Sequence, residues 1–517
     1  MGVVLGWLLY LVNFSGSVAI FVDELYVWEE PASRLAINQP IGLQQIIDSF
    51  VEETKEPIHS LQVWQPSPGS RYVELSARFG EESDLTFETY SYDAESGAPV
   101  TRREGDGVAL WLKQLHRYLA IEPKIIGRIL VGLTGVYMLV LILSGIVTHQ
   151  KIARDLFKIR WRRATRTKMR DLHNATGLWT LPFALVIAFT GIMVGAPPLM
   201  AVVAGLPMTG GDIEQLETVL APSNGPTDWG KATTLVSADK AMQIVADTTD
   251  FSPVGVHIER YGHQNAAYSV LADSSKEMLY VSYVPVDALT GTVDQEAYGR
   301  LIDGLPVSVA ARIFFASSPL HYGLYGPLIL KVLYYVLGIV VSLCIAYGML
   351  IYFERRLNGS VGHLSQRTYE HLSLVNSGLL GGLPLATLLV FYMDRLLMTA
   401  GDSRYLALAM CFVFAWLGCV IFAFIDRNAR RVGRRLLAAT AAVAIFLPMF
   451  DLLTAGSGFL NTAVLVIHSV VVCSGLCVVW YLTASHAELS GDRKAETADS
   501  FSGTAEAKEP SGPGSAT

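Results

Sequence analysis

Eight long apolar runs constrain the fold of this chain more than any other feature of its sequence. Each run could cross a hydrocarbon core of about 30 Å, which takes roughly 20 residues of helix. The composition agrees, because 51% of the 517 residues are hydrophobic and only 16% are charged, a balance that is rare in water-soluble proteins. We therefore expect a mainly α-helical, polytopic membrane protein whose spans lie near residues 2–22, 125–148, 177–203, 325–352, 373–393, 404–425, 436–453 and 460–483.

Lys and Arg residues in the short connections predict how these spans are oriented, since such residues favour the cytoplasmic side of a membrane. Three connections are basic: the stretch 148–177, in which nine Lys and Arg residues lie between two histidines, the stretch 353–371, and the stretch 426–435, which holds five arginines. The two long segments, 23–124 and 204–324, should then lie on the other side. We expect a multi-pass protein of a bacterial inner membrane with large periplasmic loops.

This orientation divides the chain into seven parts. The first run begins at Met1 without the basic flank or cleavage site of a signal peptide, which predicts a retained anchor. The C-terminal residues are rich in Ser, Gly, Ala, Glu and Pro, which predicts a disordered cytoplasmic tail. The expected parts are a first span (1–22), a periplasmic module (23–124), a two-span hairpin with a basic cytoplasmic loop (125–203), a second periplasmic module (204–324), a fourth span (325–355), a four-span extension (372–483) and the tail (484–517).

The two periplasmic segments share one pattern. In each, a stretch with helical apolar spacing precedes several runs in which apolar and polar residues alternate, as they do in strands. The helical stretch reads "IGLQQIIDSFVEE" in the first segment and "SADKAMQIVADTTDF" in the second. Both segments reach Asp-Ala-x-x-Gly, at Asp93 to Gly97 and at Asp287 to Gly291, where Asp and Gly suit a tight turn. Each segment is therefore expected to form a small α+β module.

Five motifs together resemble the PepSY-associated transmembrane family. They read "GSVAIFVDELYVWEEP", "LHRYL", "SGIVTHQKI", "RDLHNATGLWTLPFALVIAFTG" and "SPLHYGLYGPLILKVLYYVLG", and the resemblance covers about residues 1–355. It implies PepSY-like periplasmic modules and, from the members that act as ferric-siderophore reductases, haem within an inner-membrane bundle. Two features depart from the family: the cytoplasmic residues that usually precede the first span are missing, and four further spans follow residue 372.

The topology sorts four of the eleven histidines into two pairs. His149 closes the second span and His173 opens the third, so both should lie at the cytoplasmic face. His116 precedes the second span and His321 precedes the fourth, so both should lie at the periplasmic face. Neutral imidazole is a strong iron ligand, and two imidazoles on opposite faces of a porphyrin saturate the iron for electron transfer. We expect two haem b groups, with each pair supplying the axial ligands of one iron.

Other residues near the membrane faces are weaker candidates for haem contacts. Membrane-edge histidines can be ordinary interfacial residues, which is the alternative for all four. His371 begins the fifth span and could replace a member of the inner pair, and His468 lies inside the eighth span without a partner visible in the sequence. Four arginines near the pairs could bind haem propionates or, equally, lipid headgroups: Arg117, Arg128, Arg154 and Arg170.

The paired histidines favour a di-haem electron carrier, and the family resemblance implies a membrane oxidoreductase that reduces a periplasmic ferric siderophore and so releases Fe(II) for iron uptake. The haem would be non-covalent, since the sequence has no C-x-x-C-H motif. The cytoplasmic loops hold no nucleotide-binding fingerprint, so the electron donor would be a quinol or a cytoplasmic reductase, and no nucleic acid partner is expected. The alternatives are a non-redox membrane protein whose modules bind or inhibit a periplasmic partner, and an uptake permease.

Overall fold

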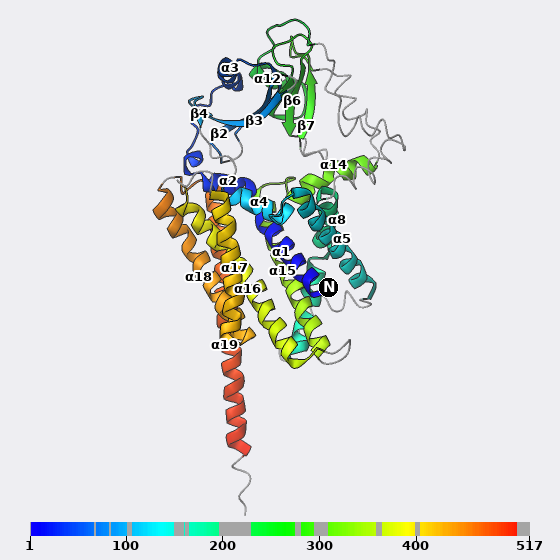
Figure 1. Ribbon diagram of the computed structural model, residues 1–517, viewed down its shortest axis with the longest axis vertical. Helices are drawn as coiled ribbons and strands as arrows, with labels where there is room; N and C mark the ends of the chain where they lie inside the picture. The colour runs from blue at the N-terminus through cyan, green and yellow to red at the C-terminus, as the bar shows by residue number, and fades with distance from the viewer. Residues whose placement is uncertain are drawn as a thin grey trace, which may run out of the picture.

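The computed structural model places a helical bundle at one end of the molecule and a β-sheet domain at the other (Figure 1). It describes the whole chain except residues 1, 67–68, 82–83, 101–105, 149–159, 161–164, 196–228, 274–280, 294–308, 358–363, 399–403, 457 and 504–517.

Four of the predicted spans form the N-terminal part of the bundle. These are α1 (Gly2–Ala19), α5 (Lys124–Thr148), the pair α7 (Thr165–Trp179) with α8 (Leu181–Gly195), and α15 (Leu328–Leu357). The axes of α7 and α8 differ by 68°. Pro182 explains this bend, because proline lacks an N–H and its ring clashes with the carbonyl four residues earlier, so the helix breaks near Thr180.

The expected four-span extension is also helical and packs beside the first four spans (Figure 1). It consists of α16 (Gln366–Leu396), α17 (Arg404–Asp426), α18 (Ala429–Ala455) and α19 (Thr462–Gly503). Ser365 caps α16 and Asn428 caps α18 through their side-chain oxygens. The described residues thus contain seven helices that could each cross a membrane, or eight spans if the bent pair counts as one. Helix α19 continues to Gly503, into the segment for which we expected disorder.

The two long segments that we expected to be periplasmic do not form separate modules but combine into one seven-stranded antiparallel sheet. The strands are β1 (Ile58–Trp64), β2 (Tyr72–Glu81), β3 (Asp84–Asp93), β4 (Pro99–Val100), β5 (Ser252–Glu259), β6 (Ala267–Asp273) and β7 (Val281–Val286). Their order is β4-β3-β2-β1-β5-β6-β7, and the two halves join where β1 pairs with β5, for example at Val63 and Val256. The sequence showed the repeat but could not show that the two inner edges pair.

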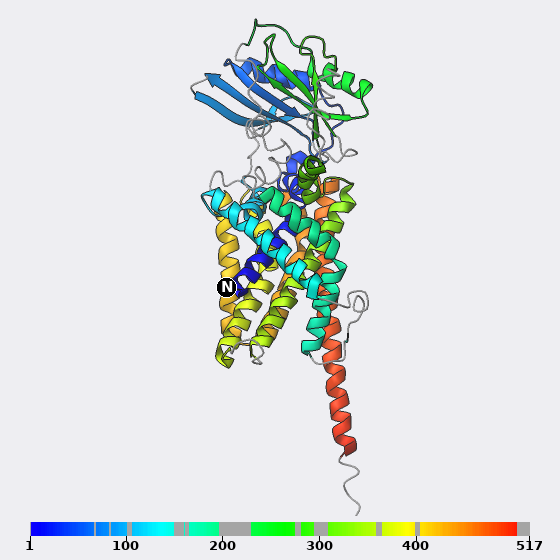
Figure 2. The same cartoon turned by 90° about the vertical axis from the view of Figure 1, so that its right-hand side faces the viewer.

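One helix from each half covers the same face of this sheet. In α3 (Leu43–Glu53) the residues Leu43, Ile46, Ile47 and Phe50 are buried, and their spacing places them on one side of the helix. Helix α12 (Ala238–Thr248) buries Ala238, Ala241, Met242 and Val245 at the same spacing. Both helices pack on the inward residues of the strands and lie on the side of the sheet away from the bundle (Figures 1 and 2).

The predicted repeat is also visible in two matching turns. The Asp93 carboxylate accepts hydrogen bonds from the amides of Glu95 and Ser96, and the Gly97 amide donates to the Asp93 carbonyl. Asp287 makes the equivalent bonds in the second half, where the Gly291 amide donates to its carbonyl. Both glycines have positive φ, +70° and +76°, which explains why glycine occupies both positions.

Three short helices and a 3₁₀ turn lie between the sheet and the bundle (Figure 1). They are α2 (Val22–Glu29), η1 (Pro31–Arg34), α4 (Val108–Tyr118) and α14 (Val309–Tyr322). Two of the predicted site histidines, His116 and His321, are near the C-terminal ends of α4 and α14. The fold therefore places both histidines at the end of the bundle that faces the sheet.

Candidate functional site

His116 and His321 lie together, although 205 positions separate them in the sequence. Their ring centroids are 6.1 Å apart and the ring planes differ by only 16°. Helix α4 packs against α1, and α14 packs against α8, so the two rings approach from different elements. The structure therefore brings together two residues that we expected at the same face of the membrane.

Hydrogen bonds fix both rings in the same way. The Nδ1 atom of His116 lies 3.1 Å from the Val12 carbonyl oxygen, which can only accept. The Nδ1 atom of His321 lies 3.0 Å from the Thr190 hydroxyl, whose own proton is donated to the Val186 carbonyl. Both Nδ1 atoms must therefore donate, and each neutral ring presents a bare Nε2.

Burial keeps both rings neutral. It lowers the pKa of His116 to about 4, with the Arg117 charge acting in the same direction, and lowers the pKa of His321 to about 3, where His116 adds to the effect. Neither histidine belongs to one of the membrane-spanning helices. A neutral imidazole whose Nδ1 donates to the protein is the form that binds a metal through Nε2.

A cavity adjoins the two histidines, and its volume of about 330 Å³ is typical of small-molecule sites. Two glycines let neighbouring helices pass close to the rings. A Cβ atom at Gly16 of α1 would lie 2.6 Å from His116 Cε1, and a Cβ at Gly191 of α8 would lie 3.1 Å from His321 Cε1. The walls are otherwise largely apolar, and three cations reach the cavity: Lys113, Arg117 and Arg128.

These residues fit a haem with two histidine ligands. Metal–nitrogen bonds of about 2 Å on both sides of an iron would place two imidazole centroids roughly 6 Å apart, which is the spacing observed here. The described residues contain no group of three or more His, Cys, Asp or Glu side chains able to hold a metal ion. A metal at His116 and His321 would therefore take its remaining ligands from groups other than the described His, Cys, Asp and Glu side chains, as an iron does from a porphyrin.

The inner pair is described only in part, because His149 lies outside the described residues. His173 of α7 repeats the pattern of the sheet-side histidines. Its Nδ1 lies 2.8 Å from the Cys344 carbonyl oxygen, and a Cβ at Gly348 would lie 3.1 Å from its Cε1. A second cavity of about 450 Å³ adjoins His173, lined by α1, α5, α7, α8 and α15. The pairing of His149 with His173 stays a prediction.

The two cavities have a common wall. Leu9 of α1 and Met138 of α5 each line both of them. These two side chains belong to a small apolar cluster with Ala184, Ala188 and Val341. The bundle therefore contains two cavities in series, one beside His116 and His321 and the other beside His173, separated by a thin apolar layer.

Comparison with known proteins identifies the family of this chain. Residues 1–355 match the model of the PepSY-associated TM region. The chain belongs to this family. It is also 40% identical over 84 residues to a protein of Pseudomonas aeruginosa called Uncharacterized protein PA4219, a match that covers 16% of this chain. The matched stretch spans 21% of that relative, about a fifth of its length. Helices α16 to α19 lie beyond the residues that match the PepSY-associated family.

The other histidines and arginines considered for the site have different surroundings. The His371 ring contacts Phe424 of the extension, with centroids 6.0 Å apart. Arg128 of α5 reaches the sheet-side cavity and donates to the Val194 carbonyl at 3.1 Å. Arg170 is exposed, and Arg154 lies outside the described residues. Of the four arginines, Arg117 and Arg128 are the two that line the cavity beside His116.

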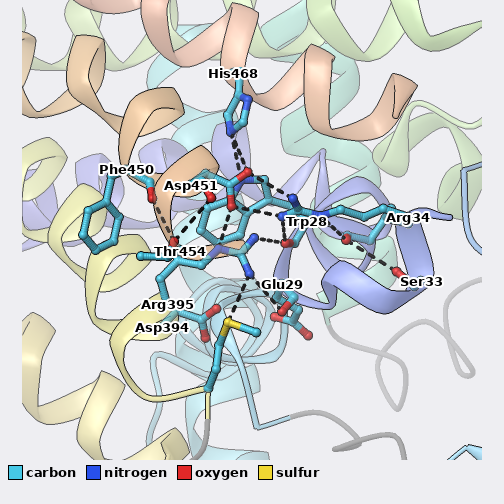
Figure 3. A network of polar contacts seen from close by, with 12 residues as sticks. Trp28, Glu29, Ser33, Arg34, Asp394, Arg395, Phe450, Asp451, Thr454 and His468 are labelled. Carbon is cyan, nitrogen blue, oxygen red and sulfur yellow. Dashed lines mark hydrogen bonds and ion pairs between the residues drawn. The ribbon is translucent and has the colours of Figure 1, made fainter. Parts of the chain in front are cut away.

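His468 does have partners, which the sequence did not reveal. Its Nε2 lies 3.2 Å from the Trp28 indole nitrogen and 3.3 Å from the Asp451 carboxylate. Figure 3 shows these residues in a buried network that also contains Arg34 and Arg395. The only sequence signal for it was the presence of charged residues within or beside apolar runs, such as Asp451.

Proposed function

We propose that the protein is a membrane oxidoreductase that carries electrons across the bilayer through two b haems and reduces a ferric siderophore beside the sheet domain. The observation that carries this proposal is the parallel pair His116 and His321, each with its Nδ1 engaged by the protein and its Nε2 bare. The family resemblance supports the same function. The sheet side would be the periplasm of a bacterium and the opposite side the cytoplasm.

Each histidine pair would hold one haem, which supplies a one-electron carrier when bound. His116 and His321 would bind the sheet-side iron through Nε2, while Val12 and Thr190 hold their rings in place. His173 and His149 would do the same at the other face. Lys113 and Arg117 lie one helical turn apart on α4 and line the sheet-side cavity, where their charges suit the propionate groups of a haem.

The position of the two cavities suits transfer of electrons between the faces. Leu9 and Met138 form a common wall, so groups held in the two cavities would be separated by little more than one layer of side chains. That layer is apolar, which keeps water and ions out of the path. The electron donor would act at the His173 side, and a quinol or a cytoplasmic reductase fits the short loops there.

The face of the sheet opposite α3 and α12 is suited to hold the acceptor near the outer pair. Side chains alternate between the two faces of a strand, so Gln62 and Trp64 point away from Leu61 and Val63, which pack under the helices. The register puts His257 and Tyr283 on this same face, with ring centroids 5.9 Å apart. A bulky ferric chelate, which carries both polar and apolar groups, matches this mixture of aromatic and polar side chains.

A visible spectrum of the purified protein tests the proposal. Bound haem should give the spectrum of a six-coordinate bis-histidine iron that dithionite reduces, and acid-acetone should extract the haem because no covalent attachment site exists. A colourless protein from haem-replete cells would rule out the proposed function. In that case a non-redox role becomes the better explanation, with the sheet face opposite α3 and α12 binding a periplasmic partner through residues such as Phe87, which is 66% exposed.

A further inference from the structure

The helix that carries His116 does not cap its own N-terminus. Residue Gly107 occupies the N-cap position of α4 and has no side chain to accept from the first amides. The first amides of a helix have no partner within the helix, and those of Val108 and Ala109 belong to residues that are fully buried. Water cannot satisfy such groups, so other parts of the chain must supply the acceptors.

Two carboxylates from distant segments supply these acceptors. Asp394 of α16 accepts from the Val108 amide at 3.0 Å, and Glu29 of α2 accepts from the Ala109 amide at 2.9 Å. A side chain at residue 107 would collide with the Glu29 carboxylate, which explains the glycine at this position. Both negative charges also lie at the positive end of the helix dipole. Helix α4 is thus capped in part by the C-terminal extension.

The extension holds this end of α4 through further contacts. Arg404 of α17 donates to Asp394 at 2.8 Å and to Asp106, two residues before α4, at 3.1 Å. Asp394 is fully buried and Arg404 is 4% exposed. One turn into the helix, the Trp111 ring packs against Phe412 of α17 with centroids 5.0 Å apart. The same 11-residue helix ends with His116 near its last turn.

The buried network in Figure 3 fixes both capping residues. Asp451 of α18 forms ion pairs with Arg395 at 2.8 Å and with Arg34 at 3.1 Å, and all three side chains are buried. Arg395 follows Asp394 directly, and its guanidinium lies 3.8 Å from the centre of the Trp28 ring, next to Glu29. Arg395 also donates to the Glu29 carbonyl at 3.2 Å. The network therefore links α16 and α18 to the segment that carries the second cap.

From these contacts we propose that the C-terminal extension positions the outer histidine pair, and that Asp394 is a positioning residue that acts on His116 through α4. This gives a role to helices that lie beyond the residues matched by the family model. The haem readout of this inference rests on the proposed function, whereas the amide readout below does not. Loss of the Asp394 cap should loosen the first turn of α4 and let the His116 ring shift relative to His321.

The test compares Asp394→Ala and Asp394→Asn with Asp426→Ala in the full chain. Asp394→Ala removes the acceptor, and Asp394→Asn keeps an acceptor oxygen for Val108 but removes the charge. Asp426 is the matched control, because its side chain is 2% exposed and pairs with Arg431 and Arg435 at the far end of α17. Hydrogen exchange by mass spectrometry is read over residues 106–118, and over α18 as a measure of the bundle as a whole.

Loss of a helix cap should speed exchange of the first amides of α4 roughly three- to tenfold in Asp394→Ala, less in Asp394→Asn and not at all in Asp426→Ala. If Asp394→Ala also speeds exchange throughout α18, the bundle as a whole has loosened and Asp394→Asn becomes the deciding variant. In Asp394→Asn, faster amide exchange confined to α4 supports the inference, and unchanged exchange in α4 overturns it. In haem-loaded protein, the spectrum of the outer site should change in Asp394→Ala while that of the inner site stays unchanged. Equal spectral changes at both haem sites would overturn the inference. A protein that binds no haem but shows faster α4 exchange in Asp394→Ala would reject the proposed function and leave the inference standing.

Discussion

The Nδ1 atoms of His116 and His321 point into the protein, toward the Val12 carbonyl and the Thr190 hydroxyl, while their rings lie nearly parallel with centroids 6.1 Å apart. In each neutral ring the Nε2 atom is then the unprotonated nitrogen, as a metal ligand requires.

The first prediction is that the outer histidines act together. His116→Ala and His321→Ala should each lower the haem content from two per chain to one, because an iron that loses one axial histidine is held by a single bond in an open cavity. The pyridine haemochrome assay measures this ratio. His371→Ala is the matched control, since its ring packs on Phe424, and it should keep two haems. Loss of both haems from each outer variant of a folded protein would contradict separate sites.

The second prediction concerns the inner site. His173→Ala and His149→Ala should each remove one haem and leave the outer one, because His173 has the same Nδ1 arrangement, with the Cys344 carbonyl as its partner. The remaining haem should have the same spectrum in both variants. Different remaining spectra would show that His149 and His173 do not share an iron.

The third prediction tests the space beside the outer rings. Gly16→Ala should displace the His116 ring, since the new Cβ would lie 2.6 Å from its Cε1, and should lower outer-haem occupancy several-fold. Gly418→Ala in α17 is the control, because no atom lies within 4 Å of a Cβ there and alanine favours helix by about 1 kcal/mol over glycine. Unchanged haem content in both variants would show that the His116 ring can move without weakening haem binding.

The fourth prediction is a pH dependence of the sheet domain. The Arg71 guanidinium, helped by the amides of the Asp93 turn, holds the pKa of Asp93 well below its usual range. A lowered carboxylate pKa stabilises the fold at pH values above the unfolded value of about 3.9, and this stabilisation is lost as the pH falls below it. The urea midpoint of the sheet domain in the full chain should therefore fall between about pH 5 and pH 2.

Asp93→Asn should remove most of that dependence, because its side chain cannot ionise. Asp48→Asn is the control: Asp48 is an exposed acid of α3 that accepts from Gln44 one turn earlier. This control should keep the full dependence. An Asp93→Asn protein with the same acid sensitivity as the parent would assign the effect to other carboxylates.

Much of this molecule could be predicted from sequence because the signals were local. Apolar runs gave the spans, and apolar spacing gave α3 and α12. The order of the spans predicted that His116 and His321 would lie at the same end of the bundle. The joining of the two sheet halves at β1 and β5 could not be predicted, since it depends on which strand edges meet.

The partners of the buried charges in the extension could not be predicted either. Asp394, Arg404 and Asp451 stand within or beside apolar runs, and their partners are far away in sequence, at residues such as Val108, Asp106 and Arg34. Burying these charges requires several contacts at once, and only the assembled fold supplies them. A single sequence shows the charges but not what compensates them.

The last prediction is directional and uses the position of the outer pair under the sheet domain. His116 and His321 are near the C-terminal ends of α4 and α14, which lie between the bundle and the sheet, and His173 lines the cavity beyond Leu9 and Met138. In proteoliposomes of known orientation with chemically reduced haems, a membrane-impermeant ferric siderophore added on the sheet side should reoxidise them rapidly. Reoxidation should slow at least tenfold when His116 or His321 is replaced by Ala, because the electron then has no haem beside the acceptor. Equal reoxidation from the opposite side, or none with any chelate tried, would reject a ferric siderophore as the acceptor.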